Sequence, residues 1–309
     1  MTTVALPSAD AENLLETIIG AGYRPVALIG SGGMGDVYRA WDHTADRYVV
    51  VKVPRRALLV DPTFRARFDG EMQASRRMTH AHVVPVLDFG EHGGLPYAIL
   101  QYMPGGTLAA RRPTQGGVPV AAPSPLLRQW LPAVADVKPT NILFDGRGRP
   151  HLGDFGIAKA IRHVGADNVG PGLTATGFAI GTPEYMAPEL VLGHAVDGRA
   201  DQYSLAVVVF EFLTGRLPIV ASTAMATMVA QATQPAPDLW SVRPEIPESL
   251  RHAVRRALAK DPAERFASCG EFAAIALVDV PAGSRDAEPR LACPGCGALI
   301  GVRSSAAGG

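Results

Sequence analysis

Gly30-Ser-Gly-Gly-Met-Gly-Asp-Val37 is the stretch that decides the fold, and the apolar run Tyr48-Val-Val-Val-Lys-Val53 follows it closely. Runs of Val, Ile and Tyr on both sides of the glycines predict β-structure from Tyr23 to Val53. A glycine loop between two strands lets backbone N–H groups close over phosphates. A dinucleotide-binding unit would need a helix directly after the glycines and an acidic residue about 20 positions on. Neither condition is met, so the pattern favours a phosphate-covering loop between strands.

Lys52 is a charged residue inside an apolar strand. The chain has only four lysines beside 25 arginines, so each lysine needs a reason. One interpretation is an exposed residue of an edge strand whose ammonium reaches solvent. The other is a compact charge aimed at phosphates and held by Glu71. That carboxylate lies on a helix predicted to begin at Asp61-Pro62, with Phe64 and Phe68 on its buried face.

Farther along, the chain changes from β to mainly helical. Strands are expected at Val83–Phe89 and Tyr97–Tyr102, and short ones at Ile142–Phe144 and Pro150–Leu152. A segment that is apolar nearly all round, Ala200–Leu213, predicts a buried central helix. Further helices are expected at Ala11–Ile19, Glu248–Ala259 and Gly270–Leu277, with loop or linker at Gly105–Pro125.

Composition excludes several classes of protein. Hydrophobic residues make up 47% and charged residues 19%, which is typical of a globular chain. Basic and acidic residues balance at 29 each, so nothing favours nucleic acid or an anionic membrane as partner. No apolar run is long enough to span a bilayer, no secretory signal is visible, and three cysteines favour a reducing compartment. We therefore expect a cytoplasmic protein.

Several motifs, in this order and spacing, resemble the eukaryotic-type (Hanks-type) serine/threonine protein kinase family, especially its bacterial members. The resemblance runs from Tyr23 to Ala276. It rests on the glycine loop to Val37, Val49-Val-Val-Lys52, Glu71, Asp136-Val-Lys138-Pro-Thr-Asn141, Asp154-Phe155-Gly156, Gly181-Thr182-Pro-Glu, Ala187-Pro-Glu189, Asp201 and Arg265. It implies the α+β, two-lobed protein-kinase fold: a β-rich N-lobe with helix C, then a helical C-lobe.

The resemblance also implies an enzyme that transfers the γ-phosphoryl group of ATP to Ser or Thr hydroxyls of proteins. In it Lys52, oriented by Glu71, pairs with the α/β-phosphates. Asp136 accepts the hydrogen bond of the substrate hydroxyl, and Lys138 neutralises the transferring phosphate. The residues implied around ATP are Gly30, Gly32, Gly35, Val37, Val50, Lys52, Leu100 as gatekeeper and Met103 at the hinge, with Asn141 and Asp154 as the ligands of Mg²⁺.

Other positions carry structural or regulatory roles in the family. Asp201 resembles the aspartate that braces the catalytic loop, and Arg265 the arginine that pairs with Glu189. Thr182 resembles the threonine that bonds to the catalytic aspartate and lysine. Thr174 and Thr176 are spaced like paired autophosphorylation sites, and ordinary loop threonines are an equally good interpretation. Phe155 and Gly156 complete the metal-binding motif.

The stretch before Asp136 departs from the family. Roughly 15 residues of the expected helix E and His-Arg pattern are missing, and Val134 and Ala135 stand where His and Arg should be. Pro132 would cost a helix about 3 kcal/mol. Helix E is therefore expected to be truncated. Two alternatives follow: a catalytically impaired pseudokinase that acts as a nucleotide-binding or scaffold module, and a gap in the recorded sequence.

These observations predict three parts: an N-terminal extension (1–22), a kinase domain (23–278, with its lobes at 23–103 and 104–278) and a flexible tail (279–309). The tail carries Cys293 and Cys296, which resemble one knuckle of a zinc ribbon, a site that needs four ligands. We expect a solvated thiol pair there, with Zn²⁺ shared between chains as the alternative. ATP and protein substrates are the expected partners, and a dimer is left open.

Overall fold

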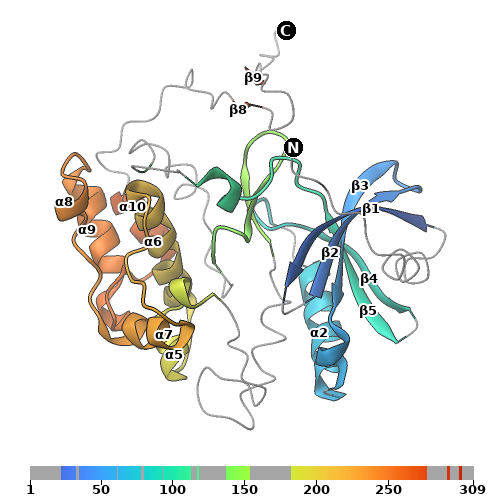
Figure 1. Cartoon of the computed structure of the whole chain (residues 1–309), viewed down its shortest axis with the longest axis horizontal. Coiled ribbons are helices and arrows are strands. Elements are labelled where there is room, and N and C mark those ends of the chain that lie inside the picture. The colour runs from blue at the N-terminus through green and yellow to red at the C-terminus, as the bar shows by residue number, and fades with distance from the viewer. Residues whose placement is uncertain are drawn as a thin grey trace.

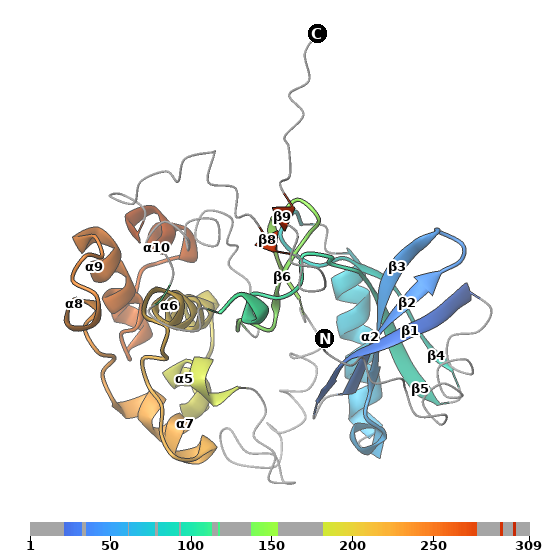
Figure 2. The same cartoon turned by 45° about the horizontal axis from the view of Figure 1, so that its top comes forward.

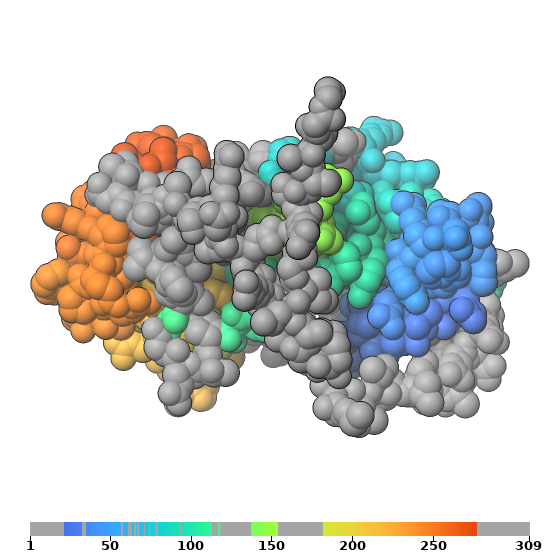
Figure 3. All heavy atoms as spheres, turned by 90° about the horizontal axis from the view of Figure 1, so that it is seen from above, coloured from blue at the N-terminus to red at the C-terminus, as the bar shows by residue number. Residues whose placement is uncertain are grey.

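The computed structural model describes residues 22–32, 35–60, 62–77, 80–92, 94–112, 117, 137–153, 182–276, 291–292 and 299–300, with some side chains of the 57–74 stretch, that of Glu71 included, outside this description. The early strands, with a helix beside them, lie at one end and the later helices lie at the other (Figure 1). Turned by 45°, the same two bodies remain separate, joined through the stretch around β6 (Ile142–Phe144) (Figure 2). Seen from above, the early residues again occupy one end and the late helices the other (Figure 3).

The N-lobe is a five-stranded antiparallel sheet in the order β1-β2-β3-β5-β4. Its elements are β1 (Tyr23–Gly32), β2 (Gly35–Asp42), β3 (Arg47–Pro54), a 3₁₀ turn (Arg56–Val60), α2 (Pro62–Arg77), β4 (Val86–His92) and β5 (Leu95–Gln101).

Side-chain alternation along β3 divides the N-lobe core into two layers. Val49, Val51 and Val53 pack on one face of the sheet. Val50 packs on the other face against α2, where Phe64, Phe68 and Met72 are almost fully buried. Residues at every second position of the strand therefore pack against residues at helical spacing on α2, in one interface.

Strand β4 begins three residues later than its sequence predicts. Val83 forms an isolated parallel bridge with Leu152, and the Val84 N–H donates to the Leu152 carbonyl (2.9 Å). Regular pairing of β4 with β5 starts at Val86, directly after Pro85, which has no N–H to donate. The apolar residues before Pro85 thus join the sheet to the C-lobe.

The described part of the C-lobe contains two short paired strands and several helices. Its elements are a 3₁₀ turn (Ala109–Arg111), β6 (Ile142–Phe144), β7 (Pro150–Leu152), η4 (Pro183–Tyr185), α5 (Pro188–Leu192), α6 (Gly198–Thr214), α7 (Ala224–Thr233), α8 (Leu239–Val242), α9 (Glu248–Ala257), a 3₁₀ turn (Pro262–Glu264) and α10 (Cys269–Ala276).

Helix α6 is the centre of the C-lobe. The Asp197 carboxylate accepts the Arg199 N–H at its start (2.8 Å), and Gly215 ends it in the left-handed conformation. Every residue from Ala200 to Thr214 is buried. The all-round apolar pattern therefore predicts the central helix correctly.

In the tail, β8 (Leu291–Ala292) pairs antiparallel with β9 (Leu299–Ile300), which the sequence did not predict. Cys293 and Cys296, like the helix expected at Ala11–Ile19, lie outside the described residues. In the part of the chain that is described, no helix is both long and apolar enough to cross a membrane.

Candidate active site

The glycine loop joins β1 and β2, with Gly30 opposite Val37 and Gly32 opposite Gly35. Gly35 has a φ of +152°, and a Cβ there would lie 2.2 Å from the Val53 carbonyl oxygen, so the protein itself requires glycine. At Gly32 an added Cβ would meet no described atom within 4 Å. The glycine at position 32 is therefore not explained by packing within the described chain, and close approach of a ligand would explain it.

Lys52 lies on β3 between Val37 of β2 and Ala98 of β5, in the interior of the sheet. The edge-strand interpretation of this lysine is therefore wrong. Burial, and after it the positive charge of Lys138, lower the pKa of Lys52 to about 8. The two ammonium groups, 86 positions apart in the sequence, thus act on one another across the lobes.

An apolar cluster lies on the same face of the sheet as Lys52. Val50, Leu100 and Met103 are buried in it, and Val37 packs against it. These are the apolar residues that the sequence assigned to the nucleotide. The structure brings all four together.

Leu143 is a further member of this cluster that the sequence analysis missed. Its neighbours in β6, Ile142 and Phe144, are buried in the C-lobe core. Alternation along the strand sends Leu143 to the opposite side, against the N-lobe cluster. The short run Ile142–Phe144 contained this signal, since a period of two leaves its middle residue facing away from the C-lobe core.

The segment 137–141 is anchored on both sides. Val137 is buried, and the Asn141 N–H donates to the Lys138 carbonyl (2.9 Å) in a tight turn. The Ala109 N–H donates to the Pro139 carbonyl (2.9 Å) from the segment after β5. Lys138 therefore sits on a fixed backbone.

Asn141 and the residue before Asp154 are neighbours across the β6–β7 ladder. Ile142 pairs with Leu152, and the Gly153 N–H donates to the Asn141 carbonyl (2.6 Å). Asn141 is itself buried. Asn141, which directly precedes β6, therefore lies beside Gly153, which directly follows β7. The second predicted metal ligand, Asp154, lies outside the described residues.

The exit from β5 into the C-lobe is held by a close backbone contact. A Cβ on Gly105 would lie 2.7 Å from the Phe144 Cβ, and the Gly105 N–H donates to the Phe144 carbonyl (2.9 Å). Arg111 donates to the Gly105 carbonyl (2.9 Å) and stacks on the Phe144 ring. Neither Gly105 nor Arg111 was singled out in the sequence.

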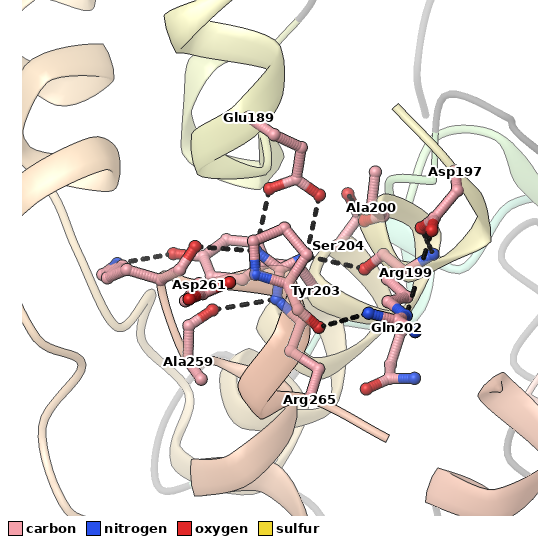
Figure 4. Close-up of polar contacts among 12 residues, drawn as sticks. Glu189, Asp197, Arg199, Ala200, Gln202, Tyr203, Ser204, Ala259, Asp261 and Arg265 are labelled. Atoms are coloured by element: carbon pink, nitrogen blue, oxygen red, sulfur yellow. Dashed lines mark hydrogen bonds and ion pairs between the residues drawn. The ribbon is translucent and has the colours of Figure 1, made fainter. Parts of the chain in front are cut away.

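Below the site, Glu189 and Arg265 form a two-pronged ion pair (Figure 4). Both bonds measure 2.8 Å and both side chains are buried. Arg265 also donates to the carbonyls of Ala259 and Arg199 (2.8 Å each). This is the pairing that the resemblance implied. The pair connects α5 to the segment that follows the 3₁₀ turn Pro262–Glu264.

Thr182 and Asp201 lie at the starts of two elements. Thr182 precedes η4, and its carbonyl accepts the Tyr185 N–H (3.1 Å). Asp201 is buried in the first turn of α6. The burial of Cys269, and after it the negative charge of Asp201, raise the pKa of the Cys269 thiol to about 12. Cys269 is therefore a protonated core residue.

Several predicted site residues lie outside the described residues. They are Asp136, Asp154, Phe155, Gly156, Thr174, Thr176 and the side chain of Glu71. The expected truncation of helix E, in the stretch that ends at Asp136, lies outside them as well.

Comparison with known proteins agrees with this geometry. Residues 23–274 match the family described as "Protein kinase domain". The serine/threonine-protein kinase PknD of Mycobacterium tuberculosis is 37% identical over 265 residues, 82% of this chain and 39% of that protein. The serine/threonine-protein kinase pkn3 of Myxococcus xanthus is 35% identical over 299 residues, 91% of this chain and 54% of that protein.

Among solved structures, the kinase domain of M. tuberculosis PknI is 30% identical with a TM-score of 0.62, covering 88% of this chain and 98% of that one. The chain spans about half or less of the length of the two curated relatives. Its matched region is the kinase domain itself. The chain therefore belongs to the protein kinase family, among the bacterial members of the eukaryotic-type (Hanks-type) serine/threonine group.

Proposed function

We propose that this chain transfers the γ-phosphoryl group of ATP to Ser or Thr hydroxyls of protein substrates. One observation carries the proposal: the charges of Lys52 and Lys138 meet beside an apolar cluster that contains Val50 and Leu100. Apolar side chains next to two ammonium groups suit a flat base attached to a chain of phosphates.

The adenine would lie among Val37, Val50, Leu100 and Leu143, with the hinge backbone at Met103 beside it. The loop at Gly30, Gly32 and Gly35 would cover the phosphates, where the open space over Gly32 lets an oxygen approach the backbone. This division places apolar surface at the base and N–H donors at the phosphates.

Phosphoryl transfer asks the protein mainly for position and neutralised charge. Lys52, oriented by Glu71, would hold the α/β-phosphates, and Lys138 would neutralise the group in transit. Asp136 would accept the hydrogen bond of the attacking hydroxyl. Lys138 is followed by Pro-Thr-Asn141, the form of this loop that the serine/threonine members have.

Asn141 and Asp154 would hold Mg²⁺. Amide and carboxylate oxygens are hard ligands of the kind that this ion prefers, and the Asn141–Gly153 contact brings their two strands together. When bound with ATP, Mg²⁺ supplies positive charge to the phosphate oxygens.

The test is incubation of the full chain with Mg²⁺ and γ-labelled ATP, beside Asp136→Asn and Asp154→Asn. We expect label on Ser or Thr in the parent and a loss of at least a hundredfold in both variants. Label that survives in both variants would come from a contaminating kinase. ATP binding without transfer in the parent would contradict the proposal and favour the pseudokinase alternative.

The finer predictions rest on this function. The span of the matched motifs supports a kinase domain over 23–278. The use of ATP as the phosphoryl donor supports a cytoplasmic location. The amide and carboxylate of Asn141 and Asp154 support the use of Mg²⁺. Autophosphorylation at Thr174 or Thr176 would be read in the same assay by mass spectrometry. Dimerisation stays a prediction, to be checked by sedimentation.

A further inference from the structure

Lys260 is a third lysine whose place in the fold needs an explanation. Its ammonium donates to the Tyr203 hydroxyl (2.8 Å), far along the chain from Lys52 and Lys138. The Tyr203 hydroxyl donates to Gln231 Oε1 (2.6 Å), and Gln231 Nε2 donates to the Glu184 carbonyl (2.5 Å). Three hydrogen bonds therefore run in one direction from an ammonium to a peptide carbonyl. We call this chain the Lys260 relay.

The direction of the relay is fixed by chemistry. An ammonium can only donate, so the Tyr203 hydroxyl must accept from it and send its own hydrogen to Gln231. Tyr203 and Gln231 are both fully buried. Because a buried polar group without a partner is costly, interrupting one bond disturbs the next one.

The surroundings of Lys260 do not favour a cation. Burial, and after it the charge of Arg265, lower the pKa of Lys260 to about 8. Both cations lie near the Tyr203 ring, whose centroid is 5.1 Å from Lys260 Nζ and 4.9 Å from Arg265 Cζ (the ring and Arg265 are drawn in Figure 4). A neutral side chain would avoid this repulsion, so stability alone does not explain the lysine.

The relay ends on η4, a turn that is held at successive groups. Ser204 Oγ donates to the Tyr185 carbonyl (2.7 Å), and the Tyr185 hydroxyl donates to Glu211 (2.7 Å). Gln231 holds the carbonyl of the preceding residue, Glu184. The turn follows Thr182 directly, and its Tyr185 N–H bonds back to the Thr182 carbonyl.

We propose that Lys260 is a positioning residue for phosphoryl transfer, which acts through Tyr203 and Gln231 on the backbone of Glu184 and so sets the place of Thr182. This inference rests on the proposed function, in which Thr182 bonds to the catalytic aspartate and lysine. Within the described part of the chain, the bonds of the Lys260 relay reach none of the residues proposed to contact the nucleotide. The relay should therefore affect kcat and leave the KM for ATP unchanged.

The test compares Lys260→Met, Tyr203→Phe and the double variant in the full chain. Tyr203→Phe removes one oxygen and keeps the ring, and Tyr97→Phe on the outer face of the N-lobe sheet is its matched control. We expect kcat to fall about tenfold in each single variant, with an unchanged KM for ATP. The double variant should be no slower than the single ones, since either change breaks the same relay.

Two results would overturn the inference: an unchanged kcat in Tyr203→Phe, or independent effects that multiply in the double variant. Hydrogen exchange provides a readout that needs no turnover. In Tyr203→Phe the amides of Tyr185 and Met186 should exchange faster than in Tyr97→Phe. If the parent transfers no phosphate, the proposed function fails, while equal exchange in the two variants would reject the relay by itself.

Discussion

Lys52 and Lys138 bring two positive charges to one site from opposite lobes. Lys52 is held by the β3 ladder, and Lys138 by the turn that closes on Asn141. Their repulsion, added to the burial of Lys52, lowers the pKa of Lys52 to about 8. Two positive charges that converge on one site favour an anion as its ligand.

The first prediction concerns Lys52→Met. The variant keeps the length and apolar stem of the side chain but removes the charge, so phosphoryl transfer should fall at least a hundredfold. The variant should remain folded, because it keeps an apolar side chain of similar length in the interior of the sheet. Steady-state kinetics and urea unfolding check the two parts. Loss of activity through unfolding would contradict this explanation.

The second prediction concerns pH. In the fold the pKa of Lys52 lies near 8 instead of 10.5, so without nucleotide the ammonium is charged below about pH 8 and loses its proton above it. ATP phosphates favour the charged form and should raise this pKa. Binding at pH 8.5 should therefore take up a proton, and affinity should fall as the pH rises further.

Calorimetry in two buffers of different ionisation enthalpy measures this uptake. It should be absent in Lys52→Met, and Lys260→Met should retain it because Lys260 does not face the nucleotide. Equal uptake in Lys52→Met and the parent would assign the proton to another group.

The third prediction compares two ion pairs. Glu189→Gln leaves the buried Arg265 without its counter-charge, which should cost about 3 kcal/mol or more of unfolding free energy. Glu245→Gln breaks the exposed pair with Arg243 and should leave stability nearly unchanged. Denaturant unfolding of both variants is the measurement. Equal effects would mean that Glu189–Arg265 is no structural anchor.

The fourth prediction compares two loop glycines. Gly35→Ala places a Cβ against the Val53 carbonyl and forces an unfavourable φ, so it should destabilise the N-lobe. Gly32→Ala meets no described atom, so the fold should remain while the KM for ATP rises severalfold. Melting temperatures and the KM for ATP separate the two. An unchanged KM in Gly32→Ala would argue against phosphates at this loop.

Local pattern predicted most of the architecture. The apolar run Tyr48–Val53 indicated β3, and the apolar segment Ala200–Leu213 indicated α6. Each pattern lies within a single element, so the sequence of that element alone contains it. The start of β4 was predicted too early, since Val83 and Val84 have strand-like side chains but bond to Leu152 in the other lobe.

Contacts between distant segments could not be predicted in this way. The Lys260 relay joins residues 28 to 57 positions apart, and no local pattern marks Gln231 as a partner of Tyr203. Leu143 differs, because alternation within β6 already separated it from Ile142 and Phe144. The resemblance to kinases implied the Glu189–Arg265 pair, although the two residues are 76 positions apart and no local signal marks them as partners.

The most direct test of the whole account is the first turnover of the purified chain. With Mg²⁺ and γ-labelled ATP, phosphate should appear on Ser or Thr in the parent and be absent in Lys52→Met at equal protein concentration. Calorimetry should show that the parent binds ATP under the same conditions. ATP binding in the parent without any transferred phosphate would contradict the proposal that this kinase fold is an active enzyme.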